Sequence, residues 1–287
     1  MRLAAVATGT GAPADGFAGM VEQVYSQVCL LTLSDQRLVT LATLSVGHLP
    51  RGITLNSPPN FQLRNYVATG GEFAARGGIL RFSRSTLSVD LRTSRRWRCD
   101  LAALNLDINK ASVLQAWTAA RVALRRDGRS DGLQRAAGST IRELVEATRN
   151  FVAPAAGEAI SALVGLGDGS TPAGDDFLVG YLAGLLSSVG VVEARTSLVS
   201  ALCEQLKAAA SRTHRVSRIY LEAAAEGQVS ERLYKVAAAI AGAAEDAVAI
   251  ATQQALNVGY SSGACCVLGF LIGCTAWSRD EHQISPL

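Results

Sequence analysis

The sequence has few histidines, few aromatic residues and no closely spaced cysteine pair. Its 287 residues include three histidines, six cysteines and 6% aromatic residues, and no two cysteines form a C-x-x-C pattern. Metal-ligating residues scattered in this way do not predict a zinc site, and the spacing favours reduced, buried thiols in a cytoplasmic protein. The net charge is only +3. Such a small charge predicts neither a nucleic-acid partner nor a membrane partner.

A long apolar segment is also missing. The most apolar run, residues 263–277, is shorter than the roughly 20 residues that a membrane span needs. The N-terminal residues lack the apolar centre of a signal peptide. Apolar residues are nevertheless abundant, at 49% of the chain. A chain of this length and composition is expected to bury two hydrophobic cores.

The pattern of hydrophobicity changes near residue 109. Before it, short apolar runs such as VCLLTL, LVTLATL and GGILRF alternate with glycine and proline turns, which predicts strands. After it, apolar residues recur at helical spacing, as in Val113, Trp117 and Leu124. The fold class expected is α+β: an N-terminal mostly-β, barrel-like domain followed by an all-α helical domain. The expected domain ranges are 1–109 and 110–287, with later helices at about 174–189, 193–211, 214–225, 229–255 and 263–277.

The helical half contains an internal pseudo-repeat. GDDFLVGYLAG, residues 174–184, aligns with GACCVLGFLIG, residues 263–273, and three glycines coincide. Glycines four residues apart share one helix face. Because a glycine inside a helix costs about 1 kcal/mol against alanine, the stripe needs a reason, and the usual one is the close approach of another backbone. We therefore expect the two helices to pack through their glycine faces, against each other or against a common third helix.

The segment GLGDGSTPAGDDFLVG, residues 165–180, leads into the first copy of the repeat. Pro172 suits the first position of a helix, and Thr171 suits its N-cap. A glycine loop before a helix N-terminus presents free N–H groups and partial positive charge, as anion-binding sites do. The ligand-binding candidates from this segment are Gly167, Gly169, Ser170, Thr171 and Gly174.

Asp175 and Asp176 follow in the first helical turn, and only this copy of the repeat has them. One interpretation is that they complement the helix dipole. The other is that they orient a substrate, act as acid and base, or hold magnesium through water. Asp176 falls on the glycine face, where a carboxylate needs a hydrogen bond, an ion pair or a cation. Both are candidate catalytic residues, and a metal requirement is left open.

Two later segments carry further candidates. SRTHRVSRIYLEAAAEG, residues 211–227, contains Thr213 and Ser217 four residues apart among arginines. This pattern is typical either of a solvated, positively charged helix face or of a site that binds a carboxylate or phosphate. GYSSG, residues 259–263, contains Ser261 and Ser262, which either cap the last helix or face the STPAG turn across the repeat, and Ser262 is a ligand-binding candidate. An arginine cluster in the β half (Arg92, Arg95, Arg96 and Arg98) is either the polar face of a strand and loop or a dock for an acidic partner.

The glycine segment resembles a known family. GLGDGSTPAGDDFLVGYLAG is similar to the motif GxGxGLTPSGDDxLxG of the AllH-like subunit of oxamate carbamoyltransferase, and residues 110–280 resemble the family well. Ser170 stands where leucine is usual, Ala173 stands where serine is usual, and Ala264-Cys265 lacks an acidic residue that members often carry. The positions that fit the motif are Gly165, Gly167, Gly169, Thr171, Pro172, Gly174, Asp175, Asp176, Leu178 and Gly180.

This resemblance implies a carbamoyltransferase subunit that acts with other subunits in purine-ureide nitrogen catabolism. The implied reaction links oxalurate and phosphate to oxamate and carbamoyl phosphate, so the substrate is a small anion, a carboxylate or a phosphate. The alternative is a non-catalytic scaffold or a small-anion-sensing subunit of a larger complex. The two differ in whether Asp175 and Asp176 line an open pocket or are sealed in helix packing. Self-association of the chain into a homo-oligomer is a further open question.

Overall fold

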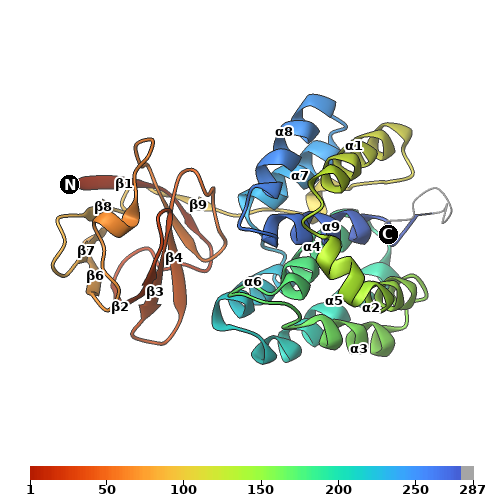
Figure 1. Ribbon diagram of the computed structural model, residues 1–287, viewed down its shortest axis with the longest axis horizontal. Helices are drawn as coiled ribbons and strands as arrows, with labels where there is room; N and C mark the ends of the chain where they lie inside the picture. Colours follow the sequence, from red (N-terminus) through yellow and green to blue (C-terminus); the bar gives the residue numbers. More distant parts are fainter. Residues whose placement is uncertain (279–287) are drawn as a thin grey trace. The chain divides into compact units, whose positions relative to one another are not determined.

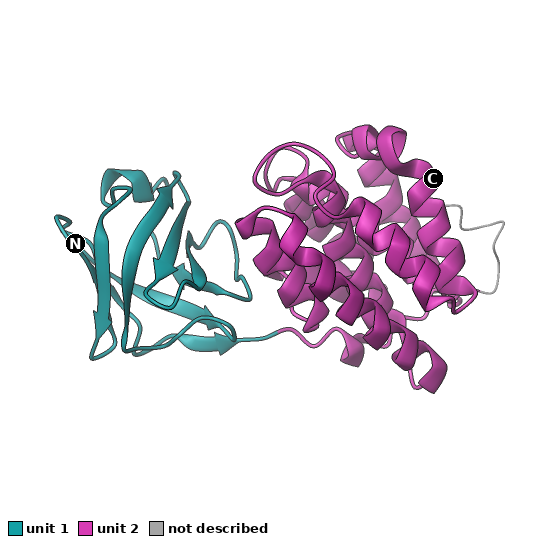
Figure 2. Ribbon diagram, turned by 90° about the horizontal axis from the view of Figure 1, so that it is seen from below, with its two compact units in different colours: residues 1–98 teal, residues 99–287 magenta. Residues whose placement is uncertain are grey.

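The computed structural model describes residues 1–278, which form two compact units. The first runs from Met1 to Arg98 and consists of strands, and the second begins at Cys99 and consists of helices (Figure 2). The α+β class with segregated elements is therefore confirmed. The last strand ends at Trp97, and the residues that lead from Cys99 to the first long helix belong to the helical unit.

The first unit is a closed β-barrel, as the sequence predicts. Neighbouring strands follow the order β5-β4-β3-β2-β6-β7-β8-β1, and β1 also pairs with β5, which closes the ring. Strand β9 continues the edge of β1 beyond β8, because Arg2–Ala4 pair with β8 and Ala7–Gly9 pair with β9. The strands are β1 (Arg2–Gly9), β2 (Phe17–Val24), β3 (Val28–Leu33), β4 (Leu38–Thr43), β5 (Gly52–Leu55), β6 (Glu72–Arg76), β7 (Ile79–Phe82), β8 (Ser88–Asp90) and β9 (Arg95–Trp97).

All four arginines of the barrel cluster are exposed, and two of them have partners in the chain. Arg92 forms an ion pair with Asp90 at 2.7 Å. Arg96 donates from Nη1 to the carbonyl oxygens of Gly9, at 2.9 Å, and Ala12, at 2.6 Å. The side chains of Arg95 and Arg98 are exposed. Part of the cluster therefore fastens β9 to the turn after β1.

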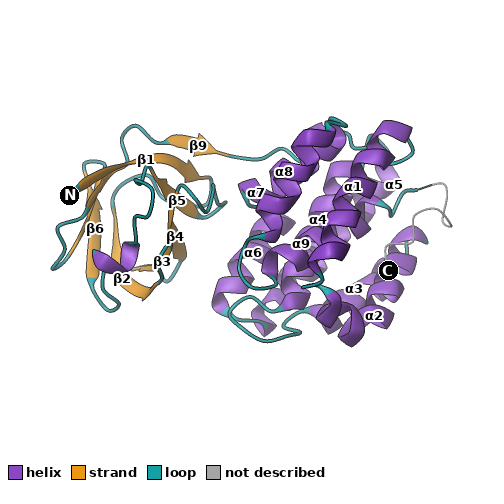
Figure 3. Ribbon diagram, turned by 45° about the horizontal axis from the view of Figure 1, so that its top comes forward, coloured by secondary structure: helices purple, strands orange, loops and turns teal. Residues whose placement is uncertain are grey.

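The second unit contains α1 to α9 (Figures 1 and 3). The expected single helix over 229–255 is wrong, since the chain breaks at Gly242 and Ala243 takes a φ of +51°. An apolar pattern cannot reveal a break made by alanines and one glycine. Helix α3 was not among the expected helices. The bounds are α1 (Ala111–Asp127), α2 (Asp131–Arg149), α3 (Ala153–Leu163), α4 (Ala173–Ser188), α5 (Glu193–Ala209), α6 (Arg215–Ala225), α7 (Glu231–Ala241), α8 (Glu245–Leu256) and α9 (Ser262–Cys274).

Helices α4 and α9, the two copies of the repeat, lie at the centre of this unit (Figure 1). A Cβ atom added to Gly180 would lie 1.9 Å from the carbonyl oxygen of Cys266, and one added to Gly269 would lie 2.0 Å from that of Phe177. The two helices therefore touch backbone to backbone through their glycine faces, as predicted. Nearly every residue of both helices is buried, so the pair forms the core around which the other helices pack.

Two simpler expectations concern cysteine and membrane insertion. All six cysteines are free, and five of them are buried. Over residues 1–278, no helix combines the length and the apolar character that crossing a membrane would require.

Candidate functional site

The loop between α3 and α4 folds back on the first turn of α4. Gly165, Gly167 and Gly169 have φ angles of +77°, +110° and +93°, a conformation that side-chain-bearing residues rarely adopt. The N–H of Gly174 donates to the carbonyl oxygen of Leu166 at 2.8 Å. A Cβ atom on Gly174 would lie 2.1 Å from the carbonyl oxygen of Leu163. Glycine at these positions therefore lets the loop lie directly against the start of α4.

The N-terminus of α4 is not capped by Thr171, so that prediction is wrong. Pro172 occupies the N-cap, with φ −54° and ψ 145°, and no side chain caps the helix. The carbonyl oxygen of Pro172 accepts hydrogen bonds from the N–H groups of Asp175, at 3.0 Å, and Asp176, at 3.1 Å. The N–H groups of Gly174, Asp175 and Asp176 thus all have partners within the chain. They are not free to bind an anion, contrary to what the sequence had led us to expect.

Asp175 is the centre of a closed hydrogen-bond network. Its side chain is 1% exposed. Oδ1 accepts from the N–H of Gly165 at 2.7 Å, and Oδ2 accepts from the hydroxyl of Ser217 at 2.6 Å and from that of Thr213. Thr213 precedes α6 and Ser217 lies in its first turn. Asp175 therefore ties the glycine loop and the start of α6 to α4, and its oxygens have the partners that a buried carboxyl group needs.

The hydroxyl of Ser217 is expected to contribute measurably to folding. Ser217→Ala leaves the buried carboxyl of Asp175 with one donor fewer, and losing a hydrogen bond to a group of this kind costs about 1.5–3 kcal/mol. Urea unfolding followed by far-ultraviolet circular dichroism measures the loss. Ser211→Ala, which removes an exposed hydroxyl from the neighbouring turn, is the control and should change stability by less than about 0.5 kcal/mol. Equal effects of the two substitutions would contradict the network.

Asp176 is also buried, but unlike Asp175 it has an oxygen atom without a hydrogen-bond partner in the described part of the chain. It is 9% exposed, yet its Oδ2 atom is buried and has no hydrogen-bond partner among the described residues. Burial raises the pKa of Asp176 to about 7, and the nearby charge of Asp175 acts in the same direction. The hydroxyls of Ser262 and Thr171 oppose this rise and lower the pKa. Asp176 thus has one oxygen atom, Oδ2, without a hydrogen bond within residues 1–278, and a pKa near neutral pH.

The hydroxyls beside Asp176 come from the starts of the two repeat helices. Oγ1 of Thr171 and Oγ of Ser262 are hydrogen-bonded at 2.9 Å. Ser261, Ser262 and Thr171 are all partly exposed. The STPAG and GYSSG turns therefore meet across the repeat, as one interpretation of the sequence predicted, and Asp176 lies beneath them.

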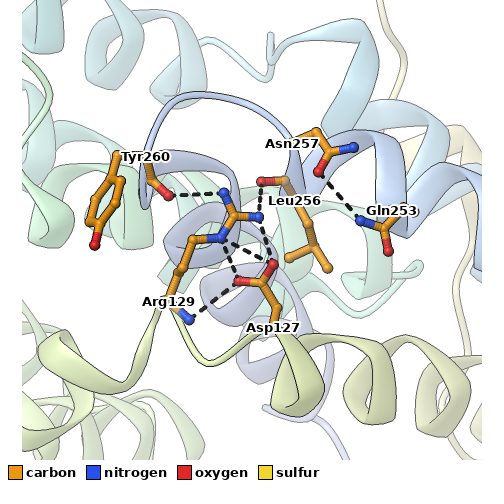
Figure 4. A network of polar contacts seen from close by, with 6 residues as sticks. All are labelled: Asp127, Arg129, Gln253, Leu256, Asn257 and Tyr260. Carbon is orange, nitrogen blue, oxygen red and sulfur yellow. Dashed lines mark hydrogen bonds and ion pairs between the residues drawn. The ribbon is translucent and has the colours of Figure 1, made fainter.

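A clamp that the sequence analysis missed holds the loop before Ser262. The guanidinium of Arg129 pairs with Asp127 at 2.6 Å and donates to the carbonyl oxygens of Leu256, at 2.8 Å, and Tyr260, at 3.0 Å (Figure 4). An Asp-Gly pair such as Asp127-Gly128 by itself indicates only where a helix ends. The signal that was available is the arginine two residues after the aspartate, but its carbonyl partners lie more than 120 residues away along the chain.

Both units of the chain match models of one protein family. The family model for the oxamate carbamoyltransferase subunit AllH matches residues 163–274, and the model for the AllH family N-terminal domain matches residues 5–96. The chain belongs to the AllH family. The match to the AllH subunit model, residues 163–274, begins at the end of α3 and ends with α9. It therefore contains the glycine loop, Asp175, Asp176 and Ser262. No curated protein sequence and no solved structure is significantly similar to the chain.

Membership of the AllH family supports a subunit role, with other subunits of the carbamoyltransferase as partners. The candidate residues of this AllH chain fall into two groups around the aspartate pair. Thr213 and Ser217 bind Asp175, whereas Thr171 and Ser262 lie beside Asp176. Gly167, Gly169 and Ser170 are exposed residues of the loop, and Gly174 is buried beneath it. The flanking arginines Arg212, Arg215 and Arg218 are exposed, and Arg218 pairs with Glu222 at 2.8 Å.

The residues around the aspartate pair offer few free ligand atoms for a magnesium ion. Among residues 1–278, no three histidine, cysteine, aspartate or glutamate side chains are grouped so that they could hold a metal ion. Asp175 also has both oxygens occupied by N–H and hydroxyl donors. Within the aspartate pair, only Asp176 has an oxygen left for a metal.

Proposed function

We propose that this AllH chain serves a carbamoyltransferase complex by binding a small anionic ligand, the carbamoyl donor or acceptor, at Asp176. The observation that carries the proposal is the buried Oδ2 atom of Asp176, which has no partner within the described chain. A buried polar atom without a hydrogen bond costs roughly 1–3 kcal/mol. Such atoms are rare in native proteins, and a catalytic or ligand-binding role is one reason for a fold to retain one.

Asp176 suits an anionic ligand because of its protonation. With a pKa of about 7, the carboxyl group is neutral in a large fraction of molecules at physiological pH. The neutral form donates a hydrogen bond to a carbonyl or carboxylate oxygen, and the ionised form accepts one from a carbamoyl N–H group. A group whose pKa lies near the working pH is also the most effective acid or base. The hydroxyls of Thr171 and Ser262 add two further hydrogen-bonding groups beside it.

In the reaction we propose, a hydrogenphosphate oxygen attacks the carbamoyl carbon of oxalurate. A new C–O bond gives carbamoyl phosphate, and the C–N bond to the oxamate nitrogen breaks. Asp176 supplies the proton that this nitrogen needs and regains one from the attacking hydrogenphosphate, so no proton is lost overall. Other subunits of the complex hold the remaining parts of the substrates. The cytoplasmic location and the role in purine-ureide nitrogen catabolism belong to the same proposal.

The ligand would reach Asp176 from the side of the glycine loop. Asp168, Gly169 and Ser170 are exposed, and Thr171 and Ser262 are partly exposed. Asp175, in contrast, is sealed and fully bonded. We therefore assign Asp176 to the ligand and Asp175 to the positioning of the loop and of α6 around it.

A second candidate is a sensing or scaffold subunit without catalytic chemistry. The burial of both carboxyl groups, at 1% and 9% exposure, favours this alternative. Such a subunit would bind the same ligand at Asp176 or none, and the reaction itself would take place on a partner.

Calorimetric titration of the full chain with oxalurate, oxamate, carbamoyl phosphate and phosphate tests the site. At least one of these anions should bind, and Asp176→Asn should weaken that binding by about tenfold or more, because asparagine cannot exchange a proton with the ligand. Asp168→Asn, a change of the same kind on the exposed loop, is the control and should leave affinity unchanged. If Asp176→Asn binds every anion as tightly as the parent chain, the ligand site is wrong.

The assembled complex distinguishes the two candidate functions. A catalytic role predicts that Asp176→Asn lowers kcat of the complex and alters its pH profile near pH 7, where Asp176 titrates. A sensing role predicts unchanged kcat at saturating substrate, together with weaker binding of the ligand to this subunit.

A further inference from the structure

A cavity that is separate from the aspartate pair lies between α1, α2 and α9. Its volume is about 510 Å³, and four arginines line it: Arg121, Arg125, Arg135 and Arg142. Leu268 of α9 also contributes to its wall, and Asp131 is the one acidic residue among the described residues that line it. Neither Asp175 nor Asp176 contributes to it, so it does not belong to the site described above.

Helical periodicity explains why the arginines converge. Arg121 and Arg125 are four residues apart on α1, and Arg135 and Arg142 are seven residues apart on α2, so each pair shares one helix face. Both helices pack on α9. Unlike the arginines near residues 92–98 and 212–218, these form no visible cluster in the sequence, because one pair lies on each of two helices.

Three of the four arginines of this cavity have no partner inside the described chain. Arg125, Arg135 and Arg142 form no side-chain hydrogen bond or ion pair with any residue among 1–278. Neighbouring Arg129, in contrast, is paired with Asp127. Burial lowers the pKa of Arg121, and the charge of Arg125 lowers it further. Arg125, Arg135 and Arg142 are exposed, and a hollow lined by positive charge attracts anions from solution.

Gly138 adds a second observation. It lies in the interior of α2 and lines the cavity. The only atom within 4 Å of an added Cβ would be Nη1 of Arg142, at 3.5 Å. No neighbouring backbone therefore requires glycine here, unlike at Gly180 in α4. The missing side chain leaves room next to the guanidinium of Arg142, at a cost to the helix of about 1 kcal/mol.

We propose that this cavity binds a small polyanion that carries at least two phosphate or carboxylate groups. Guanidinium groups match both kinds of oxyanion through paired N–H donors. The volume lies within the range of about 300–1,000 Å³ that is typical of small-molecule sites, and it exceeds what a single phosphate fills. None of the described lining residues is aromatic, and the ring of Trp117 is already covered by Arg121 at 5.2 Å. The lining therefore offers no stacking surface for a nucleobase, and the ligand is a compact, highly charged molecule.

Titration calorimetry of the full chain with pyrophosphate and with citrate, at constant ionic strength, tests the proposal. At least one of the two should bind at least tenfold more tightly than orthophosphate, because two linked anionic groups engage more than one arginine. Tighter binding of pyrophosphate identifies phosphate as the preferred group, and tighter binding of citrate identifies carboxylate. The double substitution Arg125→Gln and Arg142→Gln should weaken the binding by at least tenfold.

Two controls make the result specific. Arg126→Gln changes the same charge on the same helix outside the cavity, and it should alter the affinity by less than twofold. Asp176→Asn should leave pyrophosphate and citrate binding intact, which separates this site from the one at the glycine loop. The proposal is overturned if neither probe binds at millimolar concentration. It is also overturned if Arg126→Gln weakens binding as much as the double substitution, since diffuse surface charge would then explain the binding.

Discussion

Asparagine at position 176 is expected to stabilise the chain against unfolding at pH 8 by up to about 4 kcal/mol and to have little effect at pH 4. Burial raises the pKa of Asp176 from its ordinary value of 3.8 to about 7. Between these two values the folded chain binds more protons at this group than the unfolded chain, so its contribution to stability is lost as the pH rises. Each pKa unit corresponds to about 1.4 kcal/mol. The amide of asparagine remains partly unsatisfied in the same place, which makes about 4 kcal/mol an upper bound.

Urea unfolding of the variant and the parent at several pH values between 4 and 8, followed by far-ultraviolet circular dichroism, gives the difference directly. Other titrating groups cancel in the comparison, and the helical signal reports on the unit that contains Asp176. Asp168→Asn is the control, since Asp168 is exposed, and its effect should not depend on pH. A difference between Asp176→Asn and the parent that stays constant across this pH range would show that Asp176 is ionised in the fold at all these values.

Gly180→Ala is expected to destabilise the helical unit by about 3 kcal/mol or more, because a single methyl group overpacks the contact between α4 and α9. The new Cβ atom would lie 1.9 Å from the carbonyl oxygen of Cys266 and 2.8 Å from the backbone nitrogen of Phe270. Backbone atoms cannot rotate away as a flexible side chain can, so the two helices must separate. Gly180→Leu should be more damaging still. Gly269→Ala, whose Cβ would lie 2.0 Å from the carbonyl oxygen of Phe177, should match the effect of Gly180→Ala.

The matched control is Gly132→Ala in α2. An added Cβ there meets no atom within 4 Å, so only the higher helix propensity of alanine acts, and it should stabilise the chain by up to about 1 kcal/mol. The unfolding free energy of both variants is measured by denaturant titration. A Gly180→Ala variant within about 0.5 kcal/mol of the parent would mean that α4 and α9 do not approach as closely as their glycines indicate.

The sequence alone predicted most of the architecture. Alternating short apolar runs before residue 109 predicted the strands, and helical spacing after it predicted α1, α4 and most later helices. These features are local, because a pleated strand and an amphipathic helix repeat their burial every two or 3.6 residues. The repeat of Gly180 and Gly184 in Gly269 and Gly273 even predicted a tertiary contact. It did so because glycine in a helix is costly enough to require a close neighbour.

The predictions that failed depend either on residues that are far apart in the sequence or on small residues that show no pattern. The break between α7 and α8 falls among alanines and Gly242. Because these small residues show no helical spacing of large apolar side chains, the sequence contains no visible interruption there. Thr171 has the right chemistry for an N-cap, but its hydroxyl bonds Ser262, which is 91 residues away. The four arginines of the cavity become neighbours only because α1 and α2 both pack on α9.

The aspartate pair shows where the limit lies. The sequence determined that two carboxyl groups stand at the start of a buried helix, behind a glycine loop, on one copy of a repeat. It gave both the same candidate role, because adjacent residues have the same local surroundings. Neighbours on a helix point about 100° apart, and only the tertiary structure decided what each one meets. Asp175 meets hydroxyls from 38 and 42 residues further along the chain. Asp176 meets the turn that leads into α9, where one oxygen stays unpaired and the pKa rises to about 7 because burial penalises the charge.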